Sequence, residues 1–161
     1  MDPRIVVADA DPLSADALAL LAEAAAEARQ RYPELFAPNA PPPTNAPLGP
    51  RDAFLLTWHD GELAGCGALR PQHDPPDATC AELRRMFVRA SVRRHGVART
   101  VLAALEQRAR ALGYRRLRIE TGDRQPEAIA LYDRYADRRI APYGPYAMDP
   151  TSVCFEKDLT D

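Results

Sequence analysis

The sequence predicts a single α/β (α+β) domain in which a mixed, mostly antiparallel central sheet carries helices on both faces. The chain has 161 residues, which suits one domain with one hydrophobic core, so residues 1–161 are treated as a unit. Runs with strand-like and helix-like patterns follow one another in the order β-α-β-β-β-α-β-α-β, without an internal repeat. An Asp-Gly pair between two strand-like runs predicts a hairpin, and hence antiparallel pairing.

The N-terminal elements are predicted as a strand followed by a helix. Residues 4–8 include the β-branched run Ile-Val-Val, which favours a strand. The Asp-Pro pair at 11–12 is typical of an N-cap and a first helical position. Residues 14–31 are rich in Ala, Leu and Glu and predict a helix, which ends before Pro33 because the residue preceding a proline avoids the α region.

Residues 38–50 form a proline-rich loop inside the domain. Six prolines in this stretch exclude both a helix and a central strand. The loop is either a bare spacer or one wall of a substrate pocket.

The remaining elements follow from local patterns. Asp60-Gly61 is the hairpin turn. The predicted strands are 53–58, 62–69, 81–88, 115–120 and 153–159, and the predicted helices are 97–112 and 125–135.

Composition excludes several classes of protein. The net charge of −2 gives no global indication of nucleic-acid or anionic-membrane binding. Three cysteines and three histidines, without metal-ligand spacing, predict neither a structural disulfide nor a metal site. The first nine residues lack the apolar core of a signal peptide, so we expect a cytoplasmic protein.

Residues 92–99 read Val-Arg-Arg-His-Gly-Val-Ala-Arg, directly between a predicted strand and a predicted helix. Free N–H groups and the helix dipole make such a helix start suitable for an anion, and Gly96 lets backbone approach closely. Six arginines lie between Glu82 and Arg99 against one carboxylate. A solvated basic loop that caps the helix is the alternative.

The run Arg93-x-x-Gly96-x-Ala98 resembles the signature of the GNAT superfamily of N-acetyltransferases. The strand 81–88 before it and the helix segment 127–132, which ends in Leu-Tyr, resemble the flanking elements of that family. The resemblance covers residues 53–159 well, and the N-terminal strand and helix in order only. It implies a GNAT-like fold and an acetyl-CoA-dependent N-acetyltransferase, with direct attack of an amine on the thioester in a ternary complex.

The resemblance also implies the coenzyme site. Backbone amides of residues 94–99 are expected to hold the pyrophosphate, and the strand edge at Phe87 and Val88 to pair with the pantetheine arm where two strands splay apart. The expected coenzyme contacts are Phe87, Val88, Arg93, Arg94, His95, Gly96, Val97, Ala98, Arg99 and Gln125.

Two side chains match the family's catalytic positions. Glu82 is expected to be the general base, and strand alternation is expected to place Glu82, Arg84, Met86 and Val88 on one face. Tyr132 is expected to protonate the departing thiolate, while the N–H of Phe87 or Val88 polarises the thioester oxygen. Glu82 alternatively pairs with a neighbouring arginine, and Tyr132 is alternatively a packing residue.

The acceptor is an amine that the sequence leaves unidentified: a small amine, an amino acid, an antibiotic or a protein terminus. Tyr143 and Tyr146 in one loop, and Tyr32 with Glu34 after the N-terminal helix, are candidate acceptor walls. A homodimer is an open alternative, although no pattern indicates an interface. The Ala136-Asp137 pair stands where the family carries Gly-Phe, which keeps a non-catalytic acyl-CoA-binding module as a rival function.

Overall fold

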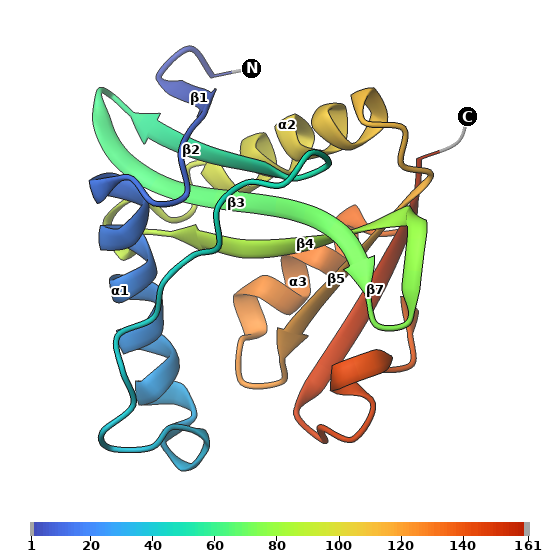
Figure 1. Ribbon diagram of the computed structural model, residues 1–161. Helices are drawn as coiled ribbons and strands as arrows, with labels where there is room; N and C mark the ends of the chain where they lie inside the picture. Colours follow the sequence, from blue (N-terminus) through green and yellow to red (C-terminus); the bar gives the residue numbers. More distant parts are fainter. Residues whose placement is uncertain (1, 160–161) are drawn as a thin grey trace.

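The computed structural model describes residues 2–159 as a seven-stranded sheet with three α-helices (Figure 1). The strands are β1 (Ile5–Asp9), β2 (Ala53–His59), β3 (Glu62–His73), β4 (Pro76–Val88), β5 (Arg116–Gly122), β6 (Arg138–Ile140) and β7 (Ser152–Asp158). The helices are α1 (Ala15–Arg31), α2 (Val97–Ala111) and α3 (Pro126–Tyr135), with short 3₁₀ turns η1 (Pro33–Leu35), η2 (Ala90–Val92) and η3 (Gly144–Tyr146).

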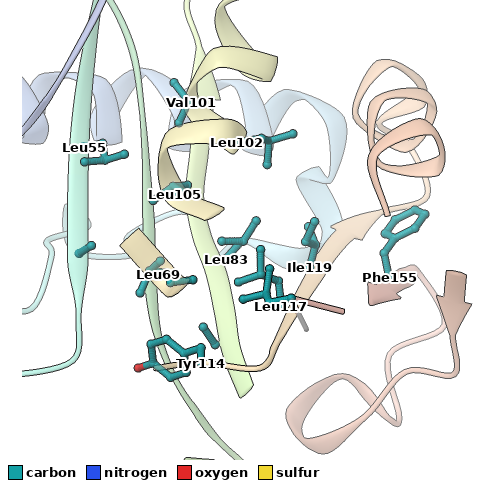
Figure 2. Close-up of a cluster of buried hydrophobic side chains, with 14 of the residues drawn as sticks. Leu55, Leu69, Leu83, Val101, Leu102, Leu105, Tyr114, Leu117, Ile119 and Phe155 are labelled. Atoms are coloured by element: carbon teal, nitrogen blue, oxygen red, sulfur yellow. The ribbon is translucent and has the colours of Figure 1, made fainter. Parts of the chain in front are cut away.

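The sheet order is β1-β2-β3-β4-β5-β7-β6, and β4–β5 is its only parallel pair among the described strands. Helices α2 and α3 cover one face, where their side chains join those of the sheet in the largest core cluster (Figure 2). Helix α1 covers the other face through Ala17 and Leu20, against Phe54, Leu56 and Cys66. The predicted fold class, a mixed and mostly antiparallel sheet with helices on both faces, is therefore confirmed.

Helix α2 forms where its apolar pattern predicts. Val97, Val101, Leu105 and Ala109 lie four residues apart, so they share one face, and each is at most 2% exposed. The helix ends at Leu112 as the cap, before Gly113 at φ 86°, a conformation that costs glycine little.

Helix α1 begins differently from the prediction. The N-cap is Ser14, whose Oγ accepts a hydrogen bond from the N–H of Ala17. The Asp11 carboxylate instead accepts from the N–H of Leu13 in the preceding turn, so the Asp11 cap was wrong. Asp and Ser are about equally favourable as N-caps, so the sequence alone does not decide between Asp11 and Ser14.

Two further elements of the sheet differ from the prediction. The β3–β4 hairpin runs on through Pro71 to Pro76, although prolines argue against strand; a register shift after Pro71 accommodates the first of them. Strand β6 was missed because three residues give no periodic signal. No helix within residues 2–159 is long and apolar enough to cross a membrane.

Candidate active site

The central feature of the site is the divergence of β4 and β5. Their pairing runs only from Cys80–Arg116 to Leu83–Ile119, yet β4 continues to Val88 and β5 to Gly122. The later half of β4 thus keeps β3 on one side and has no strand on the other. Figure 1 shows the two strands separating, with α1 on one side of the opening and α3 on the other.

Val88 turns its backbone polar groups toward this opening. The next residue, Arg89, donates its N–H to the Ala64 carbonyl of β3, and polar groups alternate sides along a strand. The Val88 N–H therefore faces away from β3. Its carbonyl does too, and accepts a hydrogen bond of 2.8 Å from Arg93 Nε.

A bulge at Arg85 breaks the regular alternation of β4. Arg85 has φ 58°, and the β3 partner shifts from Phe87–Cys66 to Arg84–Ala68 around it. Met86 consequently joins the core beneath α2, whereas Phe87 packs on the α1 side. The prediction that Glu82, Arg84, Met86 and Val88 share one face is wrong beyond Arg84.

The start of α2 has unpaired backbone N–H groups, which are the kind of group that binds anions. Gly96 caps the helix in the left-handed conformation at φ 82° and provides no side-chain cap, so the first-turn N–H groups of Val97, Ala98 and Arg99 have no partner inside the helix. Val97 is buried and fixes the helix against the sheet. Arg99 is exposed, and Arg94 extends into solvent with only a 3.6 Å approach to Glu127.

Two of the expected coenzyme residues have partners within the fold. Arg93 returns toward α1, where its guanidinium meets the Glu27 carboxylate at 2.6 Å and lies over the Phe87 ring. The His95 ring lies 5.0 Å from that of His59. His59 Nε2 is buried without a hydrogen-bond partner among residues 2–159.

Gln125 is the N-cap of α3, at the far side of the opening. Its side chain makes no capping hydrogen bond. Its backbone N–H donates to the Gly122 carbonyl, and its own carbonyl accepts from Ile129.

Glu82 is buried on the face away from α2 and α3. One carboxylate oxygen accepts a 2.9 Å hydrogen bond from the Tyr143 hydroxyl, and the other lies 3.9 Å from Arg70 Nε. Arg70 is directly opposite Glu82 on β3. The carboxylate thus has a hydroxyl partner and a neighbouring arginine.

Tyr132 projects from α3 on the opposite face. Its side chain is 5% exposed and packs near Phe155, and its hydroxyl has no hydrogen-bond partner within residues 2–159. Burial, and secondarily the Glu120 carboxylate, raise the pKa of Tyr132, so the phenol keeps its proton at neutral pH.

Glu120 is a candidate that the sequence analysis missed. It is the first β5 residue beyond the paired segment and accepts a 2.7 Å hydrogen bond from Ser152 Oγ. Burial raises the pKa of Glu120, an effect that the hydrogen bond from Ser152 and, to a lesser extent, Arg84 partly offset. A carboxylate at the end of a predicted strand was the available signal, but the strand divergence that exposes it was not visible in the sequence.

The two loop tyrosines lie on the same face as Glu82. Tyr146 accepts a long, 3.4 Å hydrogen bond from Arg84, and its ring meets that of Tyr143 edge-on. Arg118 stacks over the Tyr143 ring at 4.8 Å. Residues far apart in the sequence thus meet beside the strand divergence: Tyr143 and Glu82 are 61 residues apart, and Tyr146 and Arg84 are 62 residues apart.

Tyr32 and Glu34 bind the end of α1 to the loop after β5. The Tyr32 hydroxyl accepts from the backbone N–H of Arg124 at 2.7 Å, and Arg124 also stacks on its ring and pairs with Glu34. Gly122 leaves room for this contact. Both side chains are therefore engaged within the fold, at the far end of the opening.

The cysteines are unsuited to carry an acyl group. Burial raises the pKa of Cys80 and of Cys66 to about 12, and that of Cys154 to about 11. A thiol that stays protonated is a poor nucleophile.

The Ala136-Asp137 pair, where the family carries Gly-Phe, is anchored. The Ala136 N–H closes α3 on the Tyr132 carbonyl, and the Asp137 N–H donates to Glu156. The Asp137 carboxylate accepts from the N–H of Asp158 at 2.7 Å. The aspartate thus ties the helix exit to β7, which is a structural reason for its presence.

Known proteins resemble the chain in sequence and in fold. The Acetyltransferase (GNAT) family model matches residues 18–136. The IAA acetyltransferase of Azospirillum brasilense is 39% identical over 108 residues, which cover 66% of this chain and 67% of that protein. The uncharacterised N-acetyltransferase YsnE of Bacillus subtilis (strain 168) is 37% identical over 113 residues, covering 69% of this chain and 72% of that protein.

Solved structures agree. A Klebsiella pneumoniae protein assigned as an acyl-CoA N-acyltransferase superimposes with a TM-score of 0.76 at 32% identity, covering 97% of this chain and 98% of that one. A GNAT family acetyltransferase from Elizabethkingia anophelis, with acetyl-CoA bound, has the same fold at a TM-score of 0.63 and 17% identity, covering 98% and 99%. The family model spans most of the chain, and the chain therefore belongs to the GNAT family of acetyltransferases and is an acyltransferase.

Proposed function

We propose that this acyltransferase uses acetyl-CoA and transfers the acetyl group to an amine by direct attack in a ternary complex. The observation that carries the proposal is the divergence of β4 and β5 beside the start of α2. A free strand edge and unpaired helix N–H groups suit the amide-containing arm and the pyrophosphate of one coenzyme. The acetyl-CoA bound to the Elizabethkingia anophelis protein supports this choice of coenzyme.

The coenzyme contacts come mainly from backbone. The N–H groups of residues 94–99 bind the pyrophosphate, with Arg94 and Arg99 adding exposed positive charge. The Val88 N–H is the better placed of the two predicted amides to bind the thioester oxygen, because it faces the opening. Arg93 acts indirectly, by holding the Val88 carbonyl.

The catalytic groups approach from opposite faces of the sheet. Glu82 accepts the proton of the attacking amine, directly or through water, on the α1 face. The amine nitrogen then bonds to the acetyl carbon, the carbon–sulfur bond breaks, and the Tyr132 hydroxyl gives its proton to the departing thiolate. The raised pKa of Tyr132 means only that the phenol still holds its proton when the thiolate forms.

Calorimetric titration with acetyl-CoA tests the coenzyme, with acetyl-pantetheine and 3′-dephospho-CoA as controls. We expect acetyl-CoA to bind, 3′-dephospho-CoA to retain most of the affinity, and acetyl-pantetheine, which lacks the pyrophosphate, to lose it. Thiol release with a panel of amines then tests transfer. Equal affinity for acetyl-CoA and acetyl-pantetheine would contradict the pyrophosphate site.

Three further points stay predictions from the sequence: a reaction without a metal ion, a cytoplasmic location and a possible homodimer. Light scattering of the purified protein measures the homodimer directly.

A further inference from the structure

Two cavities lie on the α1 face, next to the bulged part of β4. The larger, of about 300 Å³, lies between α1 and the sheet and is mostly apolar, with Asn45 and Arg85 as its polar members. The smaller, of about 120 Å³, is lined by Arg70, Arg84 and Arg85. Asn45, Phe54 and Arg85 line both cavities, so the two adjoin at Arg85.

The bulge is what brings Arg84 and Arg85 to the same cavity. Neighbouring residues of a regular strand point to opposite faces. Arg85 instead adopts φ 58°, in the left-handed region that a long side chain rarely adopts, and both guanidinium-bearing residues line one wall. Strain of this kind persists where the surrounding structure holds it and often marks a functional site.

Arg85 is oriented by the proline-rich loop. Asn45, only 7% exposed, donates from Nδ2 to the Pro12 carbonyl and accepts at Oδ1 from Arg85 Nε at 2.9 Å. Neither Nη atom of Arg85 has a partner among residues 2–159. The guanidinium is thus fixed through Nε, with its other edge open to a planar anion such as a carboxylate.

The lining of the smaller cavity holds three arginines and one carboxylate, Asp52. Arg84 makes a long hydrogen bond to Tyr146 and is close enough to Glu120 to lower its pKa, and Arg70 lies 3.9 Å from Glu82. Asp52, the one carboxylate of the lining, accepts from the Gly49 N–H. Burial is the main cause that lowers the pKa of Arg85, and repulsion from Arg84 and Arg70 lowers it further. An anionic ligand would relieve this repulsion.

We propose that the acceptor is an amine that carries a carboxylate and an apolar body, of which an aromatic α-amino acid is the simplest example. The carboxylate binds the open edge of Arg85, assisted by Arg84, and the apolar body enters the larger cavity beneath α1. The amine then lies toward the unpaired part of β4. This inference rests on the proposed N-acetyl transfer. Glu34, on the other candidate acceptor wall, pairs with Arg124.

The test compares three acceptors: L-phenylalanine, 2-phenylethylamine, which lacks the carboxylate, and glycine, which lacks the apolar body. We expect kcat/KM for phenylalanine to exceed that for either analogue by about 10- to 100-fold, as for a hydrogen-bonded charged group. In Arg85→Gln the preference for phenylalanine over 2-phenylethylamine should fall by a similar factor. Arg85→Lys should retain part of the preference for phenylalanine. Asn45→Asp, which gives Arg85 a carboxylate partner within the protein, should also reduce this preference.

Arg139→Gln serves as the matched control, because Arg139 lies on β6 and pairs with Asp133. It should leave the preference unchanged, and acetyl-CoA affinity should be equal in all variants if they fold normally. A preference for 2-phenylethylamine, or one that Arg85→Gln does not alter, overturns the proposal.

A binding measurement separates this inference from the proposed function. N-acetylphenylalanine is titrated calorimetrically into the CoA-bound protein and into its Arg85→Gln variant. Arg85-dependent binding without turnover of any amine supports the carboxylate site and contradicts N-acetyl transfer. Turnover of amines without Arg85-dependent binding supports the transfer and removes the carboxylate site.

Discussion

The two sides of β4 are built in different ways. On the proposed coenzyme side, one continuous run from Phe87 to Arg99 supplies the strand edge, the turn and the helix start, and the groups proposed to bind the coenzyme are mostly backbone amides. On the acceptor side, side chains converge from distant parts of the chain. Asn45 meets Arg85 across 40 residues, and Tyr143 meets Glu82 across 61.

This difference separates two kinds of recognition. Backbone amides at a helix start bind any suitably placed phosphate, so they serve a coenzyme that many proteins share. In our proposal, the side chains that the bulge and the proline-rich loop position select the acceptor. Substitutions on the coenzyme side should therefore change affinity for acetyl-CoA, whereas those on the acceptor face should change turnover and acceptor preference.

The largest effect is expected at Glu82, the proposed general base. Glu82→Gln should lower kcat by about 100- to 10,000-fold, the range for general acid–base catalysis, with acetyl-CoA affinity retained. Glu120→Gln is compared with it, because Glu120 is the other carboxylate beside the divergence and the alternative base. Single-turnover rates measured between pH 5 and 9 check both variants.

The pH profile decides between the two carboxylates. A base must be ionised, so activity is lost as pH falls through its pKa. Burial raises the pKa of Glu120, which would move that loss to higher pH than for an ordinary glutamate. If Glu120→Gln removes the acidic limb and Glu82→Gln does not, the base is Glu120.

On the coenzyme side, Gly96→Asp should weaken acetyl-CoA binding on the order of 100-fold, through backbone strain and repulsion of phosphate. Gly113→Asp is the control, since Gly113 has a similar φ of 86° at the other end of α2. Calorimetry measures both affinities. Equal losses in the two variants would indicate damage to the helix instead of a lost phosphate site.

Tyr132→Phe should lower kcat by about 10- to 100-fold and leave acetyl-CoA affinity nearly unchanged, because only a proton donor is removed. The rate should recover partly with an acetyl thioester whose thiol is more acidic, which needs less protonation on leaving. An equal loss with both thioesters would indicate that Tyr132 serves packing.

The coenzyme side of β4 was more predictable from the sequence than the acceptor side. The fold class and the elements of the β4–α2 region were predictable, because Val97, Val101 and Leu105 repeat at helical spacing and the signature run is continuous. The bulge at Arg85 was not, since φ 58° at an arginine depends on pairing with β3 and leaves no sequence mark. Glu120 was overlooked because its exposure depends on where β4 and β5 stop pairing.

The smallest effect is expected where the two sides meet. Gly122 on β5 lies against the Tyr32 ring, and an added Cβ would come within 2.6 Å of Tyr32 Cζ and overlap its hydroxyl. Gly122→Ala should therefore reduce the free energy of unfolding by about 1–3 kcal/mol, as overpacking does, and loosen the link between α1 and the loop after β5. Urea unfolding measures the loss. Gly49→Ala, in which the added Cβ would lie 3.1 Å from an Asp52 oxygen, should reduce the free energy of unfolding by less.

If the link between α1 and the loop after β5 also shapes the acceptor cavity beneath α1, Gly122→Ala should raise KM for the amine but not for acetyl-CoA. An equal rise in both KM values would mean that the two sides of β4 are not independent.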